Sequence, residues 1–119
     1  MTARRVVLVM GAGLLLAAMP VVAHHSFKAE YDDAHPIMLN GTVTKVSWKN
    51  PHVLLSLDVK DEAGKVTNWE LELNSPRMLM SQGWKIDSLK PGDQVTASGF
   101  PAKNGENVAS IRKITLASH

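Results

Sequence analysis

The sequence of 119 residues predicts a mainly β domain behind an N-terminal secretory signal, with five strands and one short helix between the third and the fourth. Three observations support this. Apolar and polar residues alternate in runs such as 52–59, which is typical of half-buried strands. Turn-forming pairs such as Asn104-Gly105 separate the runs. Ser75-Pro76 and Gly83 bracket one short helix.

Residues 1–23 have the pattern of a secretory signal peptide. Arg4-Arg5 is a basic start, an apolar run covers 6–22, and small residues at Val21 and Ala23 match the peptidase pattern. We expect cleavage after Ala23, so that the periplasmic protein begins at His24. The alternative, a retained transmembrane anchor, is disfavoured because the apolar run falls short of about 20 residues and no basic cluster follows it.

Cleavage changes the charge of the protein. Without Arg4 and Arg5 the chain has 11 basic and 11 acidic residues, and it has no cysteine. A neutral domain without a basic patch does not favour nucleic-acid binding. The absence of cysteine excludes disulfides, thiol catalysis and thiolate metal sites. We therefore expect one small exported domain with no membrane span after cleavage and no nucleic-acid partner; its partner would be an envelope protein or a small ligand. The sequence leaves the oligomeric state open.

Residues 24–36 are expected to form an N-terminal arm, and residues 37–119 the β domain. In the arm, Phe27 and Tyr31 are four positions apart, which allows a helical turn or a docked segment. Asn40-Gly41 indicates a turn. The first long strand is then expected over 42–48, where β-branched residues are frequent.

The next two strands are expected over 52–59 and 66–73, joined by a hairpin loop that contains Gly64. A helix over 77–82 follows, capped by Asn74-Ser75-Pro76. The last two strands are expected over 94–100 and 107–116. This order of elements predicts an antiparallel OB-like barrel, with an open antiparallel sandwich as the alternative. The expected core is Val43, Val53, Leu55, Leu57, Trp69, Leu71, Val95 and Ile111.

Several motifs resemble those of a known family. They include His24-His25-Ser26-Phe27 directly after the signal, Trp48-Lys49-Asn50-Pro51-His52, and Leu89-Lys90-Pro91-Gly92-Asp93. Together they resemble the small exported bacterial proteins of the domain of unknown function 6152 type. The resemblance covers nearly the whole mature chain. It implies export and a single small domain, and it implies no particular reaction.

The histidines suggest a metal site. A mature N-terminal His24 would offer an α-amine and an imidazole to one ion, with His25 and His52 as further ligands and His35 as a weaker candidate. Imidazole suits copper, zinc and nickel, and copper is our first candidate. The alternative is structural: His24 and His25 would be an exposed start, and His52 would cap a backbone carbonyl next to the Asn50-Pro51 turn.

A metal-free binding domain is the second functional hypothesis. Trp48, Asn50 and Trp84 are its candidate contacts for a glycan, a peptide or an envelope partner. Catalysis is not expected. Glu70 and Glu72 share one strand face, where they cannot flank a scissile bond, and no nucleophile elbow or phosphate-binding loop occurs.

Overall fold

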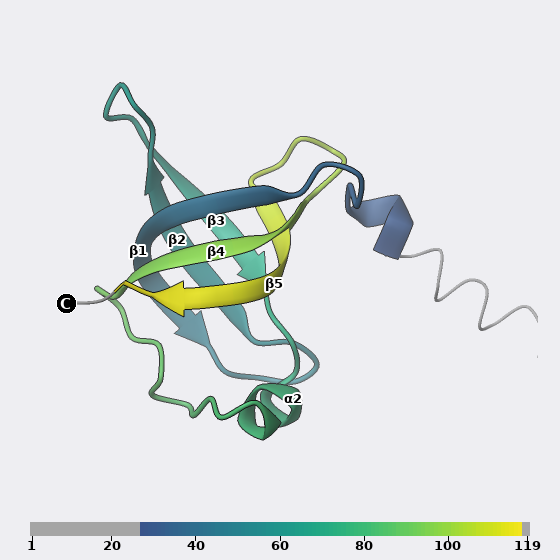
Figure 1. Ribbon diagram of the computed structural model, residues 1–119, viewed down its shortest axis with the longest axis vertical. Helices are drawn as coiled ribbons and strands as arrows, with labels where there is room; N and C mark the ends of the chain where they lie inside the picture. Colours follow the sequence, from purple (N-terminus) through teal and green to yellow (C-terminus); the bar gives the residue numbers. More distant parts are fainter. Residues whose placement is uncertain (1–26, 118–119) are drawn as a thin grey trace, which may run out of the picture. The chain divides into compact units, whose positions relative to one another are not determined.

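The computed structural model describes residues 27–117, in which residues 27–30 are helical and the residues from Tyr31 onward form the barrel. Figure 1 shows the strands curving around one core. The elements are β1 (Ile37–Ser47), β2 (Leu54–Lys60), β3 (Val66–Glu72), α2 (Pro76–Ser81), β4 (Gln94–Pro101) and β5 (Val108–Leu116). Within residues 27–117, no helix has the length and hydrophobicity needed to cross a bilayer.

The strands close in the order β1-β2-β3-β5-β4. This confirms the predicted five-stranded barrel with a helix between the third and fourth strands. The predicted antiparallel arrangement holds for four of the pairings and is wrong for one, because β3 and β5 pair in parallel, from Glu70 opposite Val108 to Glu72 opposite Ser110. The cause is geometric. Directions cannot alternate all the way around a ring with an odd number of strands, so at least one pairing must be parallel.

The predicted turn at Asn40-Gly41 is also wrong, because both residues lie inside β1. This strand pairs with β4 over Ile37–Thr42 and with β2 over Thr42–Ser47. A Cβ atom added at Gly41 would overlap the backbone oxygen of Asp58. The glycine therefore allows β1 and β2 to approach closely next to Thr42, the residue at which β1 pairs with both β2 and β4, and close backbone approach is a known use of glycine within strands.

The interior is filled by inward-facing residues of all five strands. The five largest fully buried side chains are Leu55, Leu57, Leu71, Val43 and Val53. Every predicted core residue is buried except Trp69, which is half-buried and packs against the core from its edge. Full burial of a side chain such as leucine stabilises the fold by about 1.5–3 kcal/mol.

Helix α2 lies at the end of the barrel where β3 finishes (Figure 1). The Ser75 hydroxyl accepts a hydrogen bond from the backbone N–H of Met78 at 3.2 Å, and Pro76 occupies the first turn. Gly83, with a φ of 95°, follows the helix. Leu79 is the buried residue of α2, whereas Met78 and Met80 are exposed.

Candidate functional site

A polar cluster lies beside the end of β3, and His52 is its first member. His52 belongs to the β1–β2 loop, residues 48–53. The backbone N–H of Val53 donates to the carbonyl of Asn74 at 3.1 Å, and the N–H of Leu73 donates to the carbonyl of Val53 at 2.8 Å. These two bonds place the loop against the segment that follows β3. The imidazole Nδ1 of His52 lies 3.0 Å from the carbonyl oxygen of Leu73.

This contact fixes the tautomer of His52. A carbonyl oxygen only accepts hydrogen bonds, so Nδ1 carries the hydrogen and donates it. In the neutral ring, Nε2 is then left with its lone pair. Nε2 lies 3.4 Å from Oε1 of Glu72, and the two side chains are 46% and 32% exposed. The free nitrogen and the carboxylate therefore face one another at a position that solvent can reach.

The other carboxylate oxygen of Glu72 is also engaged. Oε2 accepts a hydrogen bond from the Tyr31 hydroxyl at 3.0 Å. Tyr31 is only 6% exposed and forms a β-bridge with Ala102. The backbone N–H of Asp32 donates to the carbonyl of Pro101 at 2.8 Å. Glu72 thus belongs to the site, whereas the sequence predicts only that it shares a strand face with Glu70.

The other candidate histidines are His24, His25 and His35. His24 and His25 lie outside the described residues. His35 makes a separate, exposed pair with Asp32, with Nδ1 and Oδ2 2.9 Å apart. In the part of the chain that the structure describes, no three histidine, aspartate or glutamate side chains converge as a metal site. Within that part, the His52–Glu72 pair therefore offers two donors and not a complete ligand set.

The pairing with His35 affects the pKa of Asp32. Desolvation acts to raise the pKa of Asp32, but the hydrogen bonds from His35 and from the backbone N–H of Ala34 act in the opposite direction. The positive charges of His35 and Lys103 add to them, and together these effects lower the pKa below its ordinary value of 3.8. Asp32 is therefore held in its ionised form beside His35.

Two of the three predicted ligand-contact residues share an apolar pocket. Trp48 and Trp84 line a shallow pocket of about 420 Å³ beside α2, together with Met80, Gly83, Lys85 and Ile86. Both indole rings are half-buried and pack against the core. Met80 and Ile86 are 60% and 69% exposed. Asn50, the third candidate, is exposed and does not line this pocket.

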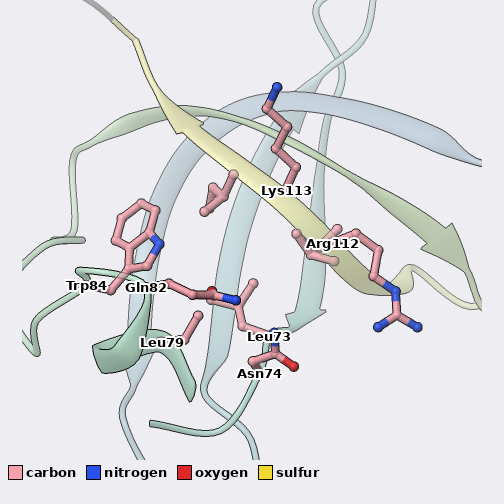
Figure 2. Close-up of a pocket in the computed structure, with 9 residues that line it drawn as sticks. Leu73, Asn74, Leu79, Gln82, Trp84, Arg112 and Lys113 are labelled. Carbon is pink, nitrogen blue, oxygen red and sulfur yellow. The ribbon is translucent and has the colours of Figure 1, made fainter. Parts of the chain in front are cut away.

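A smaller pocket of about 170 Å³ lies between α2 and β5, and Trp84 lines this one as well. Figure 2 shows the Gln82 side chain between Trp84 and Leu73, with Arg112 and Lys113 on the strand opposite. The Arg112 guanidinium lies 5.8 Å from the centre of the Phe100 ring, within the range of a cation–π interaction. Trp84 is the residue that lines both this pocket and the larger one beside α2.

The fold and the site define a small OB-fold barrel that carries a His–Glu pair and an apolar pocket at the end where α2 lies. A family model described as "Family of unknown function (DUF6152)" matches residues 12–111, and the chain belongs to this family. The resemblance inferred from the motifs is confirmed. No curated protein matches the chain.

Solved structures support the fold. One crystal form of Rim1, a mitochondrial single-stranded DNA-binding protein of S. cerevisiae, is similar with a TM-score of 0.52 and 12% identity. The match covers 69% of this chain and 91% of that one. A second form gives a TM-score of 0.51 at 11% identity, covering 72% and 97%. At these identities the similarity concerns the fold alone.

Proposed function

We propose that the protein is an exported, non-enzymatic binding module that holds a divalent metal ion, with copper as the first candidate. His52 would be the ligand from the barrel, and His24 and His25 the ligands from the mature N-terminus. The observation that supports this most directly is the bond between Nδ1 of His52 and the Leu73 carbonyl. Metal-ligating histidines commonly donate their second ring N–H in this way, which orients the ligating nitrogen.

The N-terminal ligands depend on cleavage after Ala23. An α-amine with a reference pKa of about 7.7–8.0 is only partly deprotonated near pH 7, and an ion would displace its proton. Export would thus create the amine donor.

Isothermal titration of Cu(II) into protein that begins at His24 tests this proposal. We expect tight binding of one equivalent. Adding one alanine before His24 should weaken it at least tenfold, and so should His52→Ala. The matched control is His35→Ala, which removes an exposed imidazole that pairs with Asp32 and should leave the affinity unchanged. Equal affinities in all four proteins would refute the proposal.

A metal-free ligand-binding domain is the second candidate, and the pocket shared by Trp48 and Trp84 favours it. Apolar pockets with aromatic walls are common ligand sites. Nuclear magnetic resonance titration with short oligosaccharides and apolar peptides is the test. Shifts at the two indole N–H groups that disappear in Ile86→Asp would support it. Ile86 is exposed, so this variant should fold normally; unchanged indole signals with every ligand would rule the pocket out.

The Rim1 titles describe single-stranded DNA binding, and the OB fold often binds such ligands through the outer face of its second and third strands. Here the outward positions of β2 and β3 carry three carboxylates and one lysine: Asp58, Glu70, Glu72 and Lys60. Phosphate binding requires an excess of basic groups. We therefore infer that nucleic acid is not the ligand of this face. Fluorescence anisotropy with a labelled oligothymidylate at low salt should show no binding.

A further inference from the structure

We propose that Glu72 is a second ligand of the ion held by His52, and that Tyr31 positions its carboxylate; this inference rests on the proposed metal-binding function. The distance between Nε2 of His52 and Oε1 of Glu72 is 3.4 Å. A charge-assisted N–H···O hydrogen bond is shorter, about 2.7–2.9 Å. Two donors bound tetrahedrally to one ion at about 2.0–2.2 Å lie about 3.4 Å apart. The spacing therefore fits an ion between the two side chains better than a direct hydrogen bond.

Both donors are oriented by groups that do not compete for the ion. On the histidine, the Leu73 carbonyl engages Nδ1 and leaves Nε2 available. On the glutamate, the Tyr31 hydroxyl engages Oε2 and leaves Oε1 facing the imidazole. Tyr31 is itself held by burial and by its bridge with Ala102. Each ligand thus has a supporting partner fixed to the barrel, which is how protein metal sites maintain ligand geometry.

The chemistry of the pair selects a class of ion. One imidazole nitrogen and one carboxylate oxygen suit Zn(II) and Cu(II), whereas Cu(I) prefers sulfur. Glu70 and Asp58 lie outward on the same two strands as Glu72, so the local field attracts cations. Partial exposure of both donors lets an ion enter from solvent. The site should therefore bind Zn(II) and Cu(II) in preference to Cu(I).

The test compares Glu72→Gln with Glu70→Gln. Both remove one carboxylate from the same face of β3, but only Glu72 contacts His52 and Tyr31 in the structure. Calorimetric titration of ZnCl₂ and CuCl₂ into the mature protein should give at least a tenfold loss of affinity for Glu72→Gln. Glu70→Gln should change it less than threefold. Glutamine keeps the shape of glutamate, and circular dichroism melts establish that both variants fold.

Tyr31→Phe tests the positioning role. Loss of an outer-shell partner typically weakens metal binding by about 10–100-fold. The Cu(II) electron paramagnetic resonance parameters should also change, because the carboxylate is no longer held. A merely structural role for Tyr31 would lower stability and leave this spectrum unaltered, and that result would overturn the assignment.

The remaining outcomes separate the two proposals. If the unaltered protein binds neither ion, the proposed metal function fails and this inference fails with it. If the protein binds an ion and Glu72→Gln binds it equally well, the metal function stands and the assignment of Glu72 is wrong. If Glu70→Gln weakens binding as much as Glu72→Gln, the effect comes from net charge, and Glu72 is not a ligand.

Discussion

The hydroxyl of Tyr31 donates a hydrogen bond to Oε2 of Glu72 over 3.0 Å, although the two residues are 41 positions apart. Tyr31 precedes the first strand, and Glu72 is the last residue of β3. The bond therefore links the segment before β1 to the end of β3, where His52 also makes its contacts. It is expected to contribute to stability as well as to the geometry of the site.

Tyr31→Phe should lower the free energy of unfolding by about 1–2 kcal/mol, since it removes a hydrogen bond to a charged group and keeps the buried ring. Urea denaturation measures this. A double-mutant cycle with Glu72→Gln isolates the pair, and we expect a coupling energy of about 0.5 kcal/mol or more. Additive effects of the two substitutions would show that the bond contributes nothing.

Leu57→Ala should be one of the most destabilising core substitutions, because this side chain is fully buried. Loss of a buried leucine typically costs about 2–5 kcal/mol. Leu116→Ala is the matched control, since Leu116 is 44% exposed at the end of β5. The control should cost much less. Equal losses in denaturant unfolding would contradict the assignment of Leu57 to the core.

Gly41→Asn should destabilise the barrel, because the added side chain would collide with the backbone at Asp58. Overpacking of this kind costs about 1–3 kcal/mol or more. Gly64→Asn is the control. Gly64 has a φ of 87° and open space around it, and asparagine adopts positive φ more readily than most residues. A thermal melt in which the Gly64 variant loses as much stability as the Gly41 variant would disagree with this structure.

The pKa of Asp32 gives a prediction about pH. Because this pKa is lower in the folded protein than its ordinary value of 3.8, ionised Asp32 favours the folded state above about pH 4. That contribution is lost as the pH falls through the lowered pKa. His35→Ala removes a hydrogen bond and a positive charge, so it should raise the pKa of Asp32 toward 3.8. Carboxyl carbon chemical shifts followed against pH measure this; an unchanged pKa in the variant would be the contrary result.

Local patterns in the sequence were sufficient to predict most of the barrel. Alternation over 52–59 identifies the inward residues of β2, and Ser75-Pro76 locates the start of α2. These signals depend on neighbouring residues only. The Asn40-Gly41 pair does not form the expected turn. Its glycine instead leaves room for the backbone of Asp58, which lies on a different strand. Local sequence contains no information about such a contact.

The site was less predictable for the same reason. His52 was identifiable as a candidate ligand by residue type, but its relation to Glu72 depends on strand register. Leu54 pairs with Glu72 across β2 and β3, and this register brings His52 to the end of β3. Tyr31 reaches the same place through its bridge with Ala102. Neither pairing is encoded by spacing along the chain, so Glu72 appeared to be one of two equivalent carboxylates.

The parallel contact between β3 and β5 has a consequence for incomplete chains. It covers only three residue pairs, and β5 is the last strand to be added in chain order. A fragment that stops before Val108 could not complete the ring. The edge of β3 and the edge of β4 that normally pair with β5 would then lack a hydrogen-bonded neighbour. Such unpaired strand edges promote self-association. Premature truncation should therefore yield insoluble material rather than a smaller working domain.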